Sequence, residues 1–163
     1  GDRPIAMLFQ DNNLFPHLSA EQNVGLGLRP DLRLSPEQHQ HVRESLHRVG
    51  LDGFERRKPG QLSGGQQSRV ALARLMVQSR PLILMDEPFA ALGPALKVEM
   101  LDLVARLADE SKATVLMISH DPEDARRFAP LSILVADGLV HTPRPTDELL
   151  DNPPPALQDY LGH

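Results

Sequence analysis

Residues 82–88 read LILMDEP, and this short stretch decides which fold class the sequence predicts. Four apolar residues in a row are typical of a strand buried on both faces, as in a parallel sheet. Asp86 and Glu87 follow directly, so a buried strand would deliver two carboxylates to its carboxyl end, where α/β proteins bind ligands. Considered alone, the acidic pair is explained equally well as the N-cap of a following helix.

The sequence around this stretch predicts alternating strands and helices. Further strands are expected over residues 4–9, 114–119 and 131–136, the last followed by an Asp-Gly hairpin turn at 137–138. Helices are expected over residues 64–77, from 94 to at least 107, and over 122–128 after an aspartate cap. Strands separated by helices imply parallel pairing, with helices covering both faces of the sheet.

Residues 11–62 are predicted to form a separate, helical part of the chain. Ser19 and Ser35 each begin a Ser-x-x-Gln pattern that has the form of a capping box. After the second box, apolar residues recur at helical spacing. We therefore expect a partial α/β core over residues 1–10 and 63–150, a helical subdomain over 11–62, and a peripheral tail over 151–163.

Composition and charge narrow the class of protein. The sequence contains no apolar run near the roughly 18 residues of a membrane-spanning helix and no secretory leader, so we expect a cytoplasmic location. The net charge is −5, from 17 basic and 22 acidic residues, which argues against binding to nucleic acid. The sequence has no cysteine, which excludes disulfides and thiolate metal sites.

A second candidate site is the pentapeptide LSGGQ, formed by Leu62, Ser63, Gly64, Gly65 and Gln66, which precedes a long predicted helix. Ser63 is a good N-cap, and the two glycines would let a ligand come close to the backbone. Free N–H groups and the positive end of the helix dipole would attract a phosphate group. An ordinary Ser-Gly loop that caps a helix would explain the same residues.

Two more polar residues follow predicted strands. Because parallel strands end at the same edge of a sheet, we expect Gln10 and His120 to lie near the acidic pair. Asp86 would hold Mg²⁺ through water, and Glu87 would orient or deprotonate an attacking water. Gln10 would bond Mg²⁺ or water through its carbonyl oxygen, and His120 would touch a γ-phosphate or that water. A lone histidine is more often structural, and the other six receive that interpretation.

Together these motifs resemble the ATP-binding subunits of ABC (ATP-binding cassette) transporters. The similar motifs are LSGGQQSRVALAR at 62–74 (signature motif), LILMDEP at 82–88 (Walker B), SHD at 119–121 (switch histidine) and FQDNNLFPHL at 9–18 (Q-loop). The resemblance implies an α/β fold, a P-loop ATPase core with a mostly parallel sheet plus a helical subdomain, incomplete at its N-terminus. Residues 7–18 and 23–28 are similar to thiamine-importer subunits among bacterial importers, with polyamine and ferric-iron importers nearby.

The resemblance also implies partners and cofactors. Two copies would form a head-to-tail homodimer around two ATP molecules and Mg²⁺, with the LSGGQ residues of one copy facing the γ-phosphate held by the other. Gln10, Asp86, Glu87 and His120 would act on the copy's own nucleotide. The Q-loop and the helical subdomain would receive a transmembrane permease at the inner face of the membrane, and a solute-binding protein would act indirectly.

The sequence departs from the family pattern in two ways. It contains no G-x-x-x-x-G-K-[ST] phosphate loop, since none of its three lysines follows a glycine. We therefore expect the 163-residue chain by itself to bind ATP weakly or not at all, to lack hydrolysis, and to expose apolar surface that drives self-association. Gly93 stands where the family usually has an aspartate that links the two nucleotide sites.

Three functional hypotheses follow. The first is an importer ATP-binding subunit, with thiamine as the suggested solute. The second is a catalytically inactive ABC protein that acts only as a permease-docking or dimerisation module. The third, an ABC protein of DNA repair or translation, is weakened by the compact helical insert and the acidic charge.

Overall fold

The computed structural model describes residues 4–161, so the ends of the predicted core and tail, residues 1–3 and 162–163, lie outside the described part. The chain divides into two compact units, one ending at Ile118 and the other beginning at Ser119. The predicted division into core, helical subdomain and tail stays a prediction.

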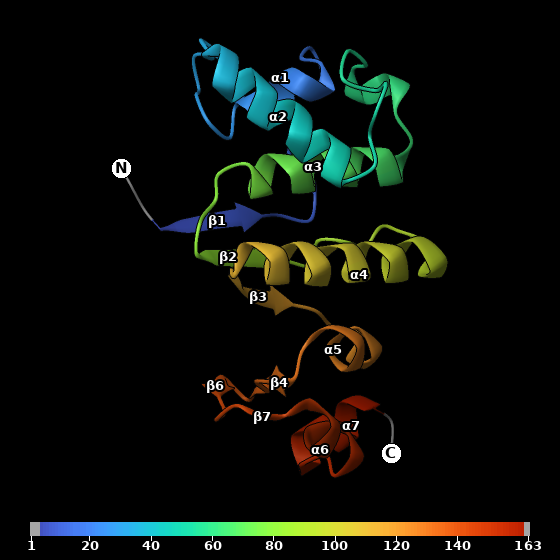
Figure 1. Ribbon diagram of the computed structural model, residues 1–163. Helices are drawn as coiled ribbons and strands as arrows, with labels where there is room; N and C mark the ends of the chain where they lie inside the picture. Colours follow the sequence, from blue (N-terminus) through green and yellow to red (C-terminus); the bar gives the residue numbers. More distant parts are fainter. Residues whose placement is uncertain (1–3, 162–163) are drawn as a thin grey trace. The chain divides into compact units, whose positions relative to one another are not determined.

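The first unit contains the sheet and most of the helices (Figure 1). Along the chain its elements are β1 (Ile5–Leu8), α1 (Ala20–Gly25), α2 (Pro36–Arg48), the 3-10 helix η1 (Pro59–Gln61), α3 (Gly64–Met76), β2 (Leu82–Asp86), α4 (Pro94–Ser111) and β3 (Thr114–Ile118). The strands and helices predicted for this part of the sequence are therefore confirmed, with ends that shift by one or two residues.

The three strands form one parallel sheet in the order β1-β2-β3. Leu8 pairs with Met85, and Asp86 pairs with Ile118, so all three strands end at the same edge. The predicted α/β fold with a parallel sheet is confirmed.

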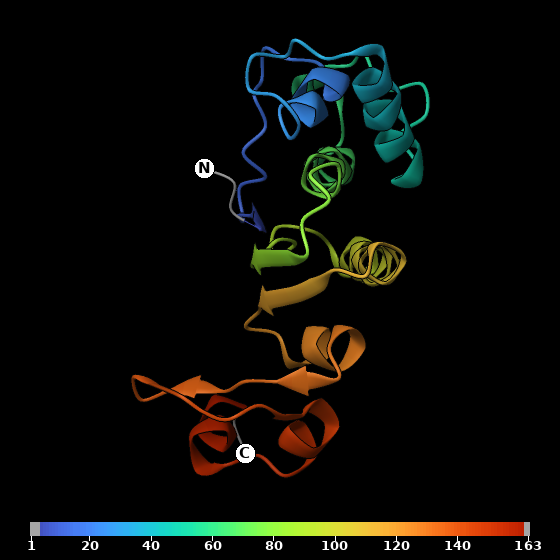
Figure 2. The same ribbon diagram turned by 60° about the vertical axis from the view of Figure 1, so that its left-hand side comes forward.

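Helix α3, which contacts β1, and helix α4, which contacts α3, lie on the same side of this sheet (Figure 2). Inward-facing Ala6, Ile83 and Met85 are each 2% exposed. On the other face, Met7 is 52% and Leu116 is 51% exposed. The prediction that helices cover both faces is wrong for the described residues, because right-handed connections between strands in sequential order place successive helices on one face.

Side-chain caps fix where the helices of this unit begin. Ser19, Ser35 and Ser63 each accept a hydrogen bond from the N–H of a glutamine three residues later, whose side chain accepts one from the cap N–H. The predicted capping boxes are confirmed. α1 and α2 pack against α3 on the side away from the sheet (Figures 1 and 2). The side chains of α2, and of the residue that follows it, that are fully buried point into this helical layer.

The second unit consists of short elements. They are α5 (Pro122–Phe128), β4 (Leu131–Ser132), β5 (Val135–Ala136), β6 (Leu139–Val140), β7 (Arg144–Pro145), α6 (Thr146–Asp151) and α7 (Pro155–Leu161). The single strand predicted over 131–136 is wrong, because the chain changes partner within it: β4 pairs with β7, whereas β5 pairs with β6. The hairpin turn is confirmed, with φ of 53° at Asp137 and 73° at Gly138, as a type I′ turn requires.

Candidate functional site

The carboxyl edge of the parallel sheet carries the first group of predicted site residues. Gln10 lies two residues beyond β1, and Asp86 is the last residue of β2, opposite Ile118 of β3. The side chains of Gln10 and Asp86 are exposed. The register of the sheet therefore brings an amide and a carboxylate to one edge, as the sequence predicts.

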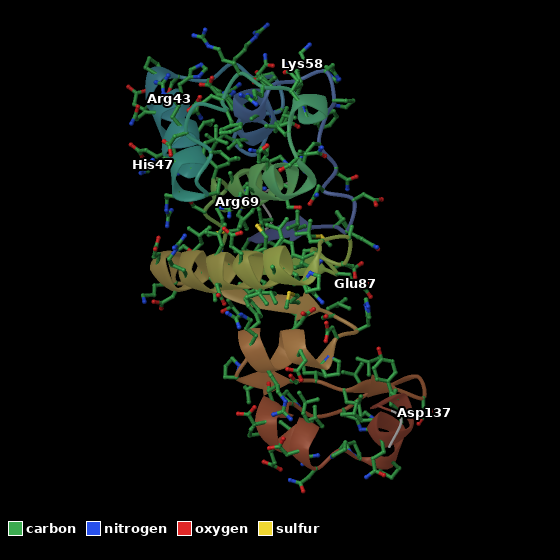
Figure 3. All side chains as sticks on the ribbon, turned by 90° about the vertical axis from the view of Figure 1, so that its right-hand side faces the viewer. Arg43, His47, Lys58, Arg69, Glu87 and Asp137 are labelled. Atoms are coloured by element: carbon green, nitrogen blue, oxygen red, sulfur yellow. The ribbon has the colours of Figure 1, made fainter. Side chains whose placement is uncertain are left out.

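Glu87 leaves β2 through an unusual backbone conformation. Its φ is 41°, in the left-handed region that few residues other than glycine adopt, and its N–H donates to the Ile118 carbonyl at 3.0 Å. This hydrogen bond to the neighbouring strand holds the turn in place, and Phe89, two residues on, is buried. Figure 3 shows Glu87 where the chain leaves the sheet. Asp86 and Glu87 thus have different backbone conformations, so neighbouring carboxylates can play separate roles.

The N-terminus of α3 carries the second group. The Ser63 hydroxyl accepts from the Gln66 N–H at 3.3 Å, and the Gln66 side-chain oxygen accepts from the Ser63 N–H at 2.9 Å. Gly64 is exposed, and a Cβ built on it would meet nothing within 4 Å, so a ligand can reach this backbone. Gly65 is buried instead: a Cβ there would lie 2.6 Å from a methyl group of Leu96.

Leu62 and Gln67 stabilise the start of α3. Leu62 is 8% exposed and belongs to the core. The Gln67 side-chain amide donates to the carbonyls of Pro59 and Leu62, at 3.1 and 3.2 Å. Gln67 is not among the residues predicted from the sequence, although it is the second glutamine of the same motif and its long amide side chain can cap nearby carbonyls.

Two further residues, neither of them predicted from the sequence, fasten the loop after Gln10. Arg74, at the end of the signature motif, donates to the carbonyls of Asn12 and Asn13. Asn23 is fully buried, and its side chain bonds both the N–H and the carbonyl of Phe15. The partners of both residues are backbone groups, which leave no trace in the sequence.

His120 lies in the second unit, two residues beyond β3 in the sequence. The hydroxyl of Tyr160, on α7, donates to the His120 carbonyl at 2.6 Å. The neighbouring Ser119 hydroxyl donates to the carboxylate of the buried Asp124, also at 2.6 Å. The histidine loop is thus held within its own unit, and the predicted closeness of His120 to Glu87 stays a prediction.

The residues at the sheet edge fit a magnesium ion by their chemistry. Mg²⁺ prefers oxygen ligands, keeps several waters, and takes only one or two protein groups together with phosphate. The Asp86 carboxylate and the Gln10 amide oxygen supply such ligands at one edge. Within residues 4–161, the structure places no group of three or more His, Cys, Asp or Glu side chains where they would hold a metal ion.

The parallel three-stranded sheet and its helices fit the α/β fold of P-loop ATPases. Residues 2–90 match the ABC transporter family. The chain is 62% identical over 162 residues to the thiamine import ATP-binding protein of Ruegeria sp. strain TM1040, covering 99% of the chain and 70% of that protein. The chain therefore belongs to the ABC transporter family.

Other relatives have the same name. The thiamine import ATP-binding protein of Cereibacter sphaeroides is 59% identical over 162 residues, which cover 99% of the chain and 70% of that protein. The corresponding protein of an Escherichia coli strain is 52% identical over 148 residues, 91% of the chain and 64% of that protein. In the part of the chain that the structure describes, no helix is long and apolar enough to cross a membrane.

Proposed function

We propose that this chain serves in the ATP-binding subunit of a thiamine importer and couples ATP binding and hydrolysis to thiamine uptake. The observation that carries the proposal is the identity of 62% and 59%, over 99% of the chain, to two proteins named for thiamine import. Polar residues at the carboxyl edge of the parallel sheet support a site for nucleotide chemistry.

The proposed chemistry divides between two groups of residues. ATP with Mg²⁺ supplies the phosphoryl group that is transferred to water. Asp86 and Gln10 hold the ion and its waters, and Glu87 orients or deprotonates the attacking water. Gly64 offers its open backbone, with the Ser63 cap and the dipole of α3, to the γ-phosphate bound to a second copy. His120 senses the γ-phosphate of the nucleotide that its own copy binds.

The proposed assembly is a head-to-tail homodimer attached to transmembrane permease subunits at the inner face of the cell membrane. The Q-loop and the surface of α1 and α2 contact the permease, and a solute-binding protein delivers thiamine to the permease. Dimer closure on ATP drives the permease between its access states, and hydrolysis resets it.

The test is uptake of labelled thiamine in the native host after disruption of the reading frame that encodes this chain. Loss of thiamine uptake, with iron and polyamine uptake retained, supports the proposal. The intact reading frame should restore uptake, and the Glu87→Gln version should not. Asp109→Asn, an exposed carboxylate on α4, is the matched control and should restore it. Unchanged thiamine uptake after disruption refutes the proposal.

A second candidate function is a permease-docking or dimerisation module without hydrolysis. The observation that favours it is the absence of a G-x-x-x-x-G-K-[ST] sequence among these 163 residues. Reading the genomic DNA upstream of Gly1 in frame separates the candidates. A phosphate loop there supports the ATPase subunit, whereas an in-frame stop supports the module.

A further inference from the structure

We propose that Arg74 is a positioning residue that fastens the loop carrying Gln10 to α3, so that this loop and α3 move together. The functional meaning of this coupling rests on the proposed roles of Gln10 and Ser63. The coupling itself rests on contacts within the first compact unit.

The first contact is a fork of two hydrogen bonds. The Arg74 Nη1 donates to the Asn13 carbonyl and the Nη2 donates to the Asn12 carbonyl, both at 2.7 Å. A guanidinium group presents two parallel donors in a rigid plane, so one side chain fixes two successive carbonyls. The loop immediately after Gln10 is therefore held in both position and orientation.

The guanidinium group of Arg74 uses its donors on these two carbonyls. The side chain is half-buried, and desolvation lowers the pKa of Arg74 below the usual value for arginine. Among the described residues, the hydrogen-bond partners of Arg74 are backbone carbonyls and not carboxylates, and desolvation is the only cause of its pKa shift. Removing a charged group from water costs free energy unless its donors find partners, so the two carbonyls compensate the partial burial of Arg74.

The loop is shaped to receive the fork. Asn12 and Asn13 have φ angles of 54° and 44°, in the left-handed region that asparagine tolerates better than most residues. The Asn12 side-chain amide also donates to the hydroxyl of Ser68 on α3, at 3.1 Å. Three hydrogen bonds thus join this loop to α3.

The next part of the loop is fastened to a different helix. The Phe15 N–H donates to the Asn23 side-chain oxygen at 2.8 Å, and the Asn23 amide donates to the Phe15 and Leu18 carbonyls. Asn23 belongs to α1. Residues 12–13 are therefore attached to α3, whereas residues 15–18 are attached to α1. Arg74 provides the attachment at the end of the loop that carries Gln10.

The test is amide hydrogen exchange of the 163-residue chain, measured by NMR without nucleotide. In Arg74→Ala, exchange of the Asn12 N–H, which is bonded to the Phe9 carbonyl, should accelerate about tenfold to hundredfold. The Phe15 N–H, held by Asn23, is the internal control and should accelerate far less.

Arg69→Ala is the matched control on the same helix. Arg69, labelled in Figure 3, also donates to a backbone carbonyl, that of Val49 at 2.6 Å. It forms an ion pair with Glu99 of α4. It should lower global stability without selective acceleration at Asn12. Equal acceleration at every amide in Arg74→Ala, or none at Asn12, overturns the proposal.

Two milder variants keep the test informative if Arg74→Ala does not fold. Arg74→Lys keeps the charge and a donor, and should give Asn12 exchange between wild type and alanine. Ser68→Ala removes the third hydrogen bond and should accelerate the same amide by a smaller factor. Wild-type exchange in both refutes the proposal. Because no nucleotide is used, this outcome is independent of whether the chain belongs to an active ATPase.

Discussion

Substitution of Gly27 by alanine tests how closely the turn after α1 packs on α3. A Cβ at Gly27 would lie 2.5 Å from the Arg74 carbonyl oxygen, 2.7 Å from Cγ1 of Val77 and 3.1 Å from the Val24 carbonyl oxygen. Two of these three atoms belong to the backbone, so they cannot move aside by changing rotamer. The helices would have to separate.

The expected cost follows from this geometry. Overpacking usually destabilises by about 1–3 kcal/mol, and a clash with backbone belongs at the upper end of that range. We expect Gly27→Ala to lower the free energy of unfolding by about 3 kcal/mol, measured by urea denaturation followed by helical circular dichroism.

Gly60→Ala is the control for this experiment, because a Cβ there would meet nothing within 4 Å. The free energy of unfolding should change by less than about 0.5 kcal/mol, as at most surface positions. If Gly27→Ala unfolds at the same urea concentration as the control, the close approach of the turn to α3 is not present in solution.

Three further predictions concern a helix cap, an ion pair and the open face of the sheet. Gly93 is the N-cap of α4 with open space around it, so Gly93→Asp should raise the free energy of unfolding by a few tenths of a kcal/mol; a decrease in the same urea assay contradicts this. The side-chain hydrogen bonds from Arg29 lower the pKa of Asp31 to about 2, so its stabilising contribution, present above the ordinary carboxyl pKa, should disappear as pH falls toward 2. Carbon-13 NMR titration should show the pKa of Asp31 raised toward the ordinary carboxyl value in Arg29→Ala, although the hydrogen bond from the Arg33 N–H remains; an unchanged midpoint refutes the assignment. The exposed apolar face predicts concentration-dependent self-association in sedimentation velocity, reduced by Leu116→Lys; a monomer at all concentrations excludes it.

Features governed by neighbouring residues were predictable from the sequence. The helix starts at Ser35 and Ser63 depend on a cap and a glutamine three residues apart, and the hairpin at 137–138 depends on two residues with positive φ. The carboxyl-edge position of Gln10 and Asp86 followed from parallel pairing alone. In each case the information lies within a few residues or in one topological rule.

Features governed by distant partners were not predictable. The apolar run at 131–136 reads as one strand, but its two ends pair with different strands. Coverage of the sheet depends on strand order, and the order β1-β2-β3 places both packing helices on one face. Arg74 was missed because its partners are carbonyls, which every residue carries.

In the first unit, α3 is the element that contacts α1, α2, α4 and the sheet. Its start, at Gly65, touches Leu96 in the first turn of α4 so closely that a Cβ would not fit without movement. Its end holds the Gln10 loop through Arg74, whose own carbonyl limits how near the turn at Gly27 can come. Since close-packed contacts transmit displacement, the proposed coupling predicts that a displacement of the start of α3 reaches the Gln10 loop. In the proposed dimer, a phosphate that one copy places against Gly64 of the other would then also displace the Gln10 loop of that other copy.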